Sequence, residues 1–343
     1  MATPFAARLA VRAGMVDHPR GGRFHATPTP YLGGLAVALG LILVGVISAG
    51  AQAQLLTILA CGLVLCATGL LDDWRTVHPL VRVGVESGCG VALWVVGIRA
   101  AFFGVPAVDL VLMVGFVVLI TNTVNLLDNM DGLSSGVVAI SALCFFTIAA
   151  TRGDYLVASL ALVVAGASLG FLRHNFPPAS IFLGDTGSLM LGFFLSALAL
   201  KLDLVGPQRS VRAVVVVLIL GVPLFDTLLV IIARSRGKRK IYVGGADHSS
   251  HRLSTYGYSA RKVVLVTYAA QTLSCGIALA LTNAPLNVIV MSLIVMTGIV
   301  AVLLLVMLRM PHPLHEAPEP GVLLLPEAEQ RSFTQDERRL ESN

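Results

Sequence analysis

The sequence predicts an all-α fold, a polytopic bundle of transmembrane helices, and two observations carry that prediction. Of its 343 residues, 56% are hydrophobic and only 13% are charged, a balance too apolar for a soluble globular protein of this size. In addition, apolar runs of 17 to 24 residues recur along most of the chain. A helix of about that length crosses a hydrocarbon core of about 30 Å. The lipid bilayer is therefore the expected solvent.

The apolar runs give about ten expected spans, in one integral membrane domain over 1–310. The five cysteines fall inside the runs without the spacing of a zinc site, so we expect them to be packing residues. Residues 311–343 combine several prolines with a mixed Glu/Arg stretch, which predicts a disordered cytoplasmic tail. The expected spans are 31–50, 54–71, 82–103, 106–124, 133–151, 155–172, 186–202, 210–233, 262–282 and 286–309.

The distribution of basic residues predicts the orientation in the membrane. Nineteen of the 24 Lys and Arg residues fall on one set of alternating loops and termini, and five fall on the other. Because cytoplasmic loops carry the positive excess, the richer side is assigned to the cytoplasm. We expect a multi-pass protein of the inner (plasma) membrane, with the basic run 234–240 anchored at the membrane surface.

The same alternation also separates the polar loops from the apolar ones. All loops rich in Asp, Asn and His fall on the predicted cytoplasmic side, at 14–30, 72–81, 122–132, 173–185 and 234–261. A transporter would be expected to place ionisable groups near the bilayer midplane, often within an internal repeat, and no such repeat is apparent. We therefore expect an active site in the cytoplasmic loops, and keep a transporter of small anions as the non-enzyme alternative.

Asp72 and Asp73 end the second expected span. Two adjacent carboxylates next to hydrocarbon are costly unless a cation neutralises them. A divalent metal that carries phosphates would do so, because Mg²⁺ combines one or two carboxylates with water and phosphate oxygens. The alternative is a solvated helix end without a ligand.

Asn122, Asn125 and Asp128 would share one face of a helix at i, i+3 spacing, with Asp131 one turn further. Amides and carboxylates in this pattern can bind a nucleoside or order the surroundings of a metal. The alternative is a simple turn at Asp131-Gly132, which explains the glycine but not the spaced polar residues.

Two further loops carry candidate phosphate ligands. Asp185 lies between Gly184 and Gly187 at the start of an expected helix, where free N–H groups favour phosphate. In the last loop, His248 and His251 are followed by Arg252, a set that can bind a pyrophosphate. A zinc site on the two histidines is the rival interpretation.

In this order, the segments resemble the polyprenyl-phosphate N-acetylhexosamine-1-phosphate transferases of glycosyl transferase family 4, over roughly residues 14 to 262. The aspartate pair, Arg82 after it, the segment Asn122 to Leu133 and the run from Asn175 to Ser188 match family motifs. An N-terminal motif is matched by Asp17, Pro19, His25, Pro28, Thr29, Pro30, Gly33 and Gly34. The pattern His-x-x-His-Arg-Leu at 248–253 is similar to the WecA/TagO-like branch rather than to the MraY branch.

This resemblance implies transfer of N-acetylhexosamine-1-phosphate, with GlcNAc-1-phosphate expected first, from a UDP-amino sugar to an undecaprenyl or decaprenyl phosphate. UMP would be released, and the step would begin cell-wall or surface-glycan synthesis. It implies catalytic roles for Asp72, Asp73 and Asp185, and Mg²⁺ or Mn²⁺ on Asp185 and Asp73. The implied substrate-binding residues are His25, Arg82, Asn122, Asn125, Asp128, Asp131, Asn175, His248, His251 and Arg252. Nucleic acid is not an expected partner, and a homodimer is left open.

The chain departs from the family pattern at Gly22, Arg23, Thr76 and Asn129. The family also usually has a span before the Asp17 motif, where this chain has too few residues, so either an upstream start or a missing helix is expected. An MraY-type phospho-N-acetylmuramoyl-pentapeptide transferase is the alternative within the family. The CDP-alcohol phosphatidyltransferase signature is absent, because Leu133 follows Asp131-Gly132. A single in-line displacement is favoured over a covalent aspartyl-phosphate, because the acceptor phosphate is already largely dianionic.

Overall fold

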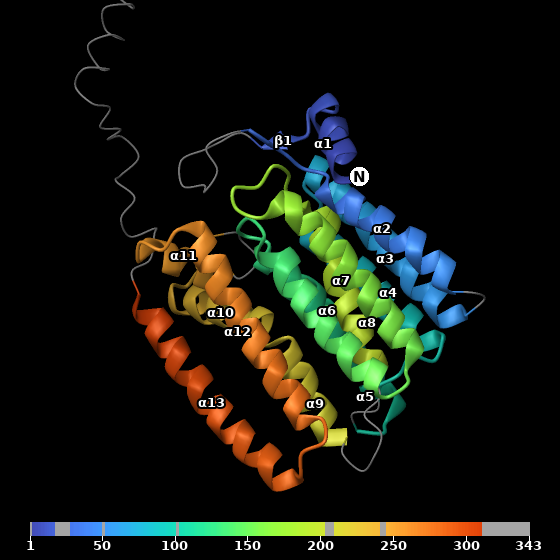
Figure 1. Ribbon diagram of the computed structural model, residues 1–343, viewed down its shortest axis with the longest axis vertical. Coiled ribbons are helices and arrows are strands. Elements are labelled where there is room, and N and C mark those ends of the chain that lie inside the picture. Colours follow the sequence, from blue (N-terminus) through green and yellow to red (C-terminus); the bar gives the residue numbers. More distant parts are fainter. Residues whose placement is uncertain are drawn as a thin grey trace, which may run out of the picture.

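The computed structural model describes residues 2–17, 28–49, 52–100, 103–202, 209–240 and 245–310, and these ranges are almost wholly α-helical (Figure 1). The all-α prediction is confirmed for this part of the chain, and the predicted tail 311–343 lies outside it. The elements are α1 (Ala2–Arg12), β1 (Val16–Asp17), β2 (Thr29–Pro30), α2 (Gly33–Ala49), α3 (Ala53–Trp74), α4 (Pro79–Val95), α5 (Pro106–Leu127), α6 (Leu133–Thr151), α7 (Tyr155–Asn175), α8 (Gly184–Lys201), α9 (Arg209–Ile219), α10 (Gly221–Arg236), α11 (Ser249–Thr255), α12 (Ala260–Leu281) and α13 (Leu286–Arg309).

Six of the described helices are long and apolar enough to cross a membrane, namely α3, α5, α6, α7, α12 and α13. A seventh span results if α9 and α10, which meet at an angle of 77°, count as one broken span. Helices α2 and α4, with 17 residues each, and the less apolar α8 do not meet the same criteria. A multi-pass membrane protein is thus supported, whereas the number of ten spans stays a prediction.

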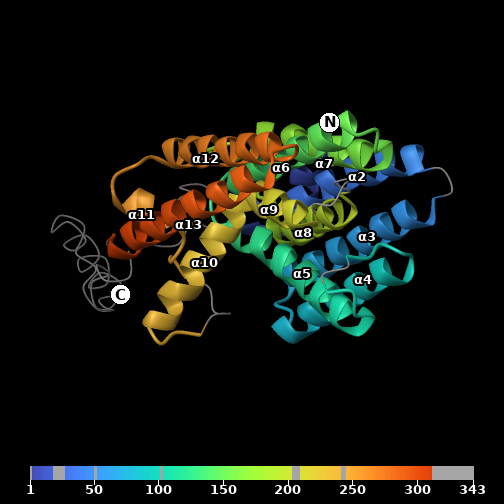
Figure 2. The same ribbon diagram turned by 90° about the horizontal axis from the view of Figure 1, so that it is seen from below.

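Helix α8 forms the centre of the bundle. It packs against α2, α3, α5, α6 and α7, which surround it when the molecule is viewed from below (Figure 2). All residues from Thr186 to Leu200 are buried. A helix enclosed by protein needs no lipid-facing side chains, which explains why α8 can be less apolar than its neighbours. The five cysteines are buried and free, so their prediction as packing residues is confirmed.

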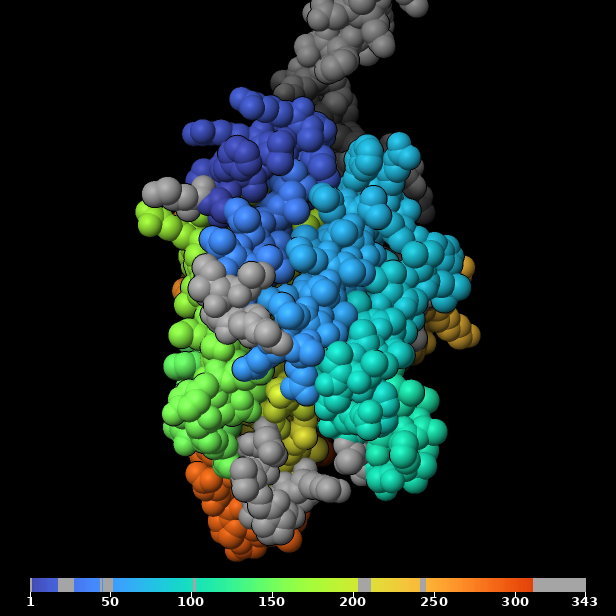
Figure 3. Space-filling view, turned by 90° about the vertical axis from the view of Figure 1, so that its right-hand side faces the viewer, coloured from blue at the N-terminus to red at the C-terminus, as the bar shows by residue number. Residues whose placement is uncertain are grey.

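Two glycines allow α2 and α3 to contact the first turn of α8. A Cβ atom on Gly34 would lie 2.2 Å from the backbone nitrogen of Gly187, and one on Gly69 would lie 2.2 Å from the carbonyl oxygen of Asp185. Both separations are impossible for a side chain, so only glycine permits this backbone approach. The result is that the aspartates at the end of α3 lie beside Asp185. The outer side chains of α2, α3, α4 and α5 form one face of the molecule (Figure 3).

The break between α9 and α10 is stabilised by side chains from other helices. Gln271 on α12 donates to the carbonyl oxygen of Ile219 and accepts a hydrogen bond from the backbone N–H of Val222. Ser141 on α6 also donates to the Ile219 oxygen. These bonds satisfy backbone groups that a break inside a bilayer would otherwise leave unpaired. Helix α13 lies on the outside of the bundle with its apolar side chains exposed, as expected for a lipid-facing helix (Figure 1).

Candidate active site

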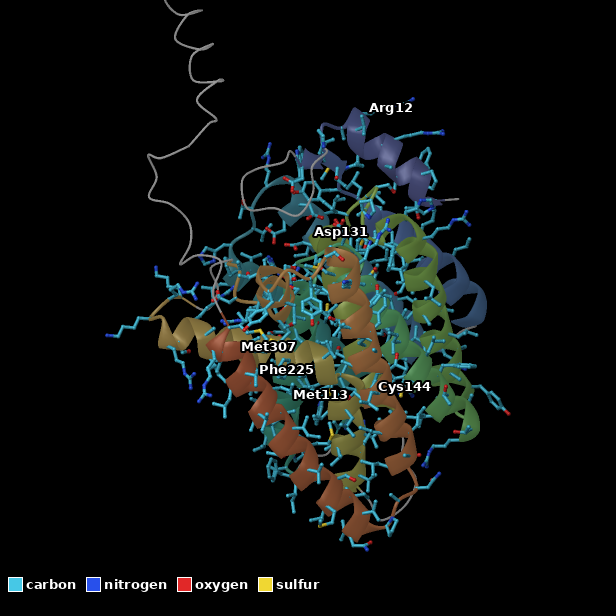
Figure 4. The ribbon with its side chains drawn as sticks, turned by 60° about the vertical axis from the view of Figure 1, so that its left-hand side comes forward. Arg12, Met113, Asp131, Cys144, Phe225 and Met307 are labelled. Carbon is cyan, nitrogen blue, oxygen red and sulfur yellow. The ribbon has the colours of Figure 1, made fainter. Side chains whose placement is uncertain are left out.

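A cavity of about 600 Å³ opens at the end of the bundle where α3 and α5 end and α8 begins. Asp131 marks this end in Figure 4, on the same side of the molecule as Arg12 of α1, while Met113, Cys144 and Phe225 lie further along the bundle. Loops that are distant in sequence thus meet at one cavity. Its lining consists of Asp17, Tyr31, Asp72, Asp73, Asn125, Leu126, Asp128, Asn129, Met130, Asp131, Asn175, Phe182, Leu183, Gly184, Asp185, Gly245, His248 and His251.

Most of the predicted site residues line this cavity. Nine of them do so: Asp72, Asp73, Asn125, Asp128, Asp131, Asn175, Asp185, His248 and His251. Three described residues, Arg82, Asn122 and Arg252, are not among its lining residues. His25 lies outside the described part of the chain. The structure thus brings together at one cavity residues from the loops that the sequence assigns to the cytoplasm.

Arg82 in the first turn of α4 connects the carboxylates of two other helices. One guanidinium nitrogen donates to Asp72 at 2.6 Å and to Asp185 at 3.0 Å, and the second donates to the amide oxygen of Asn125 at 2.8 Å. Asn125 in turn donates to Asp185 at 2.7 Å. The Asp185 side chain is still 32% exposed, whereas that of Asp72 is only 7% exposed. Asp185 is therefore the carboxylate of this network that is more open to a ligand.

Asp73 caps the N-terminus of α8. Its carboxylate accepts hydrogen bonds from the backbone N–H groups of Asp185 and Thr186, at 2.9 and 3.0 Å, and from the Thr186 hydroxyl at 2.6 Å. A carboxylate at this place satisfies N–H groups without helical partners and interacts favourably with the helix dipole. The second aspartate of the pair thus has a structural task, besides the catalytic and metal-binding roles predicted for it.

The capping role of Asp73 can be tested by measuring the stability of the folded protein. We expect Asp73→Ala to lower the free energy of unfolding by about 1–3 kcal/mol for each buried donor left without a partner. Thermal unfolding of the purified protein in detergent would measure this as a lower Tm. An unchanged Tm combined with lost activity would show instead that Asp73 serves only the reaction.

The Asn/Asp segment does not form the single polar helix face that its spacing suggested. Helix α5 ends at Leu127, so Asp128 and Asp131 belong to the turn that follows. Asn122 points to α4 and donates to the buried carboxylate of Glu86 at 2.5 Å. Of the two asparagines on the helix, only Asn125 lines the cavity.

Asp131 and Asn175 join the two loops that border the cavity. Asp131 accepts a hydrogen bond from the backbone N–H of Ala179 at 2.8 Å. Asn175 accepts from the N–H of Gly132 and donates to the carbonyl oxygen of Ile181, both at 3.0 Å. These hydrogen bonds hold the two loops together and thereby fix the geometry of the cavity wall.

Crowded carboxylates give the cavity a strongly acidic end. Burial raises the pKa of the Asp128 carboxyl well above its usual range, and the negative charges of Asp185, Asp73 and Asp131 raise it further. An opposite charge within a few ångströms would relieve this repulsion. Among the described residues, no group of three or more His, Cys, Asp or Glu side chains is arranged to hold a metal ion.

The histidine loop contributes His248 and His251 to the cavity, but Arg252 points elsewhere. Arg252 is 3% exposed and donates to the backbone carbonyl oxygens of Asp247 and Met307. The guanidinium therefore attaches α11 to the end of α13. This geometry does not favour the predicted grip of Arg252 on a pyrophosphate, because Nε and one terminal nitrogen donate to backbone oxygens and Arg252 is not among the residues that line the cavity.

Part of the basic run before this loop is also buried. Arg234, which is 2% exposed, donates to the carboxylate of Asp247 at 3.1 Å, and Arg239 pairs with the same carboxylate. The prediction that Arg234 lies at the membrane surface is therefore wrong, because its side chain is buried and pairs with the buried carboxylate of Asp247. Together these contacts hold the start of the histidine loop.

The sequence interpretation missed several residues that belong to the site or support it. Tyr31 lines the cavity, as do Asp17, which belongs to a family motif, and Asn129, which departs from one. Asp226 bonds to the lining residue His248, and Glu86 bonds to Asn122 on α5. Both carboxylates occur inside apolar runs, and an ionisable residue within a membrane span is by default a candidate functional residue. That signal could have found them.

Comparison with known proteins identifies the family. The model of glycosyl transferase family 4 matches residues 55–203. The chain is 36% identical over 280 residues to the probable undecaprenyl-phosphate N-acetylglucosaminyl 1-phosphate transferase of Bacillus subtilis, covering 78% of this chain and 77% of that protein. It is 34% identical over 302 residues to the decaprenyl-phosphate N-acetylglucosaminephosphotransferase of Mycobacterium tuberculosis, covering 76% and 74%.

A relative named for the transfer of a different group is also similar. The phospho-N-acetylmuramoyl-pentapeptide-transferase of Bacillus thuringiensis is 30% identical over 275 residues, which cover 71% of this chain and 82% of that protein. The similarity to each of the three relatives extends over more than two thirds of this chain. The protein belongs to glycosyl transferase family 4.

Proposed function

We propose that this protein transfers N-acetylglucosamine-1-phosphate from UDP-N-acetylglucosamine to a polyprenyl phosphate and releases UMP. The observation that carries the proposal is the similarity, over about three quarters of each chain, to relatives named for this reaction on undecaprenyl and decaprenyl phosphate. The acidic cavity at the end of the bundle supports it. Such a site can receive a water-soluble nucleotide sugar from the cytoplasm and a phosphate on a lipid from the bilayer.

Mg²⁺ fits the chemistry of this cavity. Asp185 and Asp128 offer the hard oxygen ligands that Mg²⁺ prefers. Burial raises the pKa of the Asp128 carboxyl, and the negative charges of Asp185, Asp73 and Asp131 raise it further, a repulsion that a cation would relieve. Because Mg²⁺ is usually held by one or two carboxylates with substrate phosphates and water, a set of three protein ligands is not required. When bound, the metal would neutralise the phosphate charges of the donor. Asp185 and Asp128 would hold it, with Asp73 behind them.

The reaction is proposed to be one displacement. The lipid phosphate has its second pKa near 6, so at neutral pH it is largely a dianion that needs no general base. One of its oxygens attacks the β-phosphorus of the donor, and the bond from that phosphorus to the oxygen bridging to the α-phosphate breaks, so that UMP leaves with the electron pair. Bringing two anions together is the difficulty, which the positive charge of Arg82 and a metal held by the carboxylates would help to overcome.

The residues have distinct proposed tasks. Arg82 holds Asp72 and Asp185 in place, and Asn125 orients Asp185. His248 and His251 face the donor phosphates, whereas Arg252 fixes the loop that carries them. The cavity is proposed to face the cytoplasm, in agreement with the excess of Lys and Arg on that side of the sequence.

Transfer of phospho-N-acetylmuramoyl-pentapeptide is the second candidate, which the similarity to the Bacillus thuringiensis enzyme favours. Purified protein would be incubated with undecaprenyl phosphate, Mg²⁺ and either donor, and UMP would be measured. We expect UMP release with UDP-N-acetylglucosamine at least about tenfold faster than with the muramoyl-pentapeptide donor, the discrimination that about 1.4 kcal/mol provides. The reverse order would favour the second candidate.

A further inference from the structure

A buried carboxylate lies directly behind the cavity, on a helix that does not line it. Asp226 of α10 is 1% exposed. One carboxylate oxygen lies 2.7 Å from Nδ1 of His248, and the other accepts hydrogen bonds from the backbone N–H of Ser249 at 2.8 Å and from its hydroxyl at 2.6 Å. Asp226 thus has partners only in the histidine loop among the contacts that the structure describes.

The contact with Nδ1 determines how His248 meets the cavity. A carboxylate accepts hydrogen bonds, so Nδ1 carries the proton of this pair. The two ring nitrogens lie on different edges of the imidazole, and the bond made by one sets the orientation and the proton of the other. His248 is itself 4% exposed and lines the cavity. With Nδ1 turned to Asp226, Nε2 is the nitrogen left to face a ligand.

The place of Asp226 in the fold favours a fixed orientation. Asp226 follows the break between α9 and α10, where Gln271 bonds to backbone groups on both sides. The histidine loop is held at two further points, by Arg252 on the carbonyl oxygen of Met307 and by Ser250 on the side chain of Asn129. The imidazole is therefore positioned by a rigid surrounding rather than by a free loop.

We propose that Asp226 is a positioning residue that holds His248 with Nε2 toward the diphosphate of the nucleotide-sugar donor. The proposal rests on the proposed function, and it adds a residue on α10 to the donor site. Carboxylates behind histidine ligands act in the same way in metal sites, where their loss typically reduces affinity or activity 10–100-fold. The competing explanation is that Asp226 only anchors the first turn of α11 through Ser249.

Steady-state kinetics of UMP release separate the two explanations. Each substrate would be varied while the other is saturating, for the wild type, Asp226→Ala, Asp226→Asn, His248→Gln and the double variant Asp226→Ala/His248→Gln. We expect Asp226→Ala to lower kcat/KM for UDP-N-acetylglucosamine about 10–100-fold while the KM for polyprenyl phosphate stays unchanged. Asp226→Asn, which keeps the shape and an acceptor for Ser249, should lie between the wild type and Asp226→Ala.

The double variant tests whether Asp226 acts through His248. If it does, adding Asp226→Ala to His248→Gln causes no further loss, because coupled residues are not additive. Asp109→Asn is the matched control, since Asp109 is a buried aspartate that caps the N–H groups of Phe103 and Gly104 at the other end of the bundle. We expect its kinetics to equal those of the wild type.

Several results would overturn the proposal. Additive losses in the double variant, or a raised KM for the lipid instead of the donor, would show that Asp226 does not act through His248 on the donor. If Asp226→Ala does not fold, Asp226→Asn decides, and wild-type kcat/KM in that variant contradicts the proposal. If the wild type releases no UMP from any UDP-amino sugar, the proposed function is overturned as well. If the wild type turns over normally and the Asp226 variants match it, only the proposal for Asp226 is overturned.

Discussion

Asp185→Asn is expected to abolish Mg²⁺-dependent UMP release while the protein stays folded. Asp185 begins α8, keeps 32% of its side chain exposed and is oriented by Arg82 and Asn125. The substitution keeps the size of the side chain but removes one negative charge from the proposed metal site. Since a bound metal contributes several kcal/mol of transition-state stabilisation, we expect the rate to fall by roughly 10³-fold or more.

A magnesium titration of the wild type and the variant would measure this effect. Asp109→Asn serves as control, because it removes a buried charge from the opposite end of the bundle. Thermal unfolding of both variants in detergent shows whether they fold. Equal rates for Asp185→Asn and the wild type at every magnesium concentration would refute the assignment of the metal to Asp185.

Asp72→Asn is expected to slow turnover without revealing an intermediate. One oxygen of Asp72 accepts from the backbone N–H of Val77 at 2.7 Å, and the other accepts from Arg82 at 2.6 Å. A carboxylate with both oxygens engaged and 7% exposure is better suited to hold Arg82 than to attack a phosphorus. A charged hydrogen bond contributes about 1.5–3 kcal/mol, so the rate should fall about 10- to 100-fold.

An exchange experiment without lipid distinguishes this role from nucleophilic catalysis. A covalent aspartyl intermediate would let the enzyme and donor alone exchange labelled UMP into UDP-N-acetylglucosamine. We expect the wild type to show no exchange until polyprenyl phosphate is added. Exchange without lipid that disappears in Asp72→Asn would establish the two-step mechanism instead.

Local sequence patterns predict the helices and the gathering of the polar loops, but not the partners of individual side chains. Apolar runs specify helices because each run must satisfy its own backbone in lipid. The sequence predicts one span over 210–233, whereas the structure bends by 77° between α9 and α10. The groups that permit the bend come from Gln271 on α12, which is distant in sequence.

The roles of charged residues depend in the same way on long-range contacts. Arg252 follows two histidines and was predicted to bind phosphate, yet the end of α13 supplies the carbonyl oxygen that it binds. Asp73 is predicted to hold a metal as a member of the aspartate pair, and the structure adds a capping contact, since Gly69 leaves room for the first turn of α8 to approach. Spacing in the sequence identified the residues at the cavity, whereas packing between helices determined what each of them contacts.

The fate of the β-phosphorus tests the central claim most directly. UDP-N-acetylglucosamine labelled with ³²P at the β position would be incubated with the purified protein, Mg²⁺ and undecaprenyl phosphate, and the lipid and water-soluble products would be separated. Transfer of the sugar phosphate predicts that all transferred label appears in the lipid fraction, with one unlabelled UMP released for each labelled lipid. Label that remains in water-soluble UDP while the sugar moves to the lipid, or no lipid product at all, would contradict the proposed reaction.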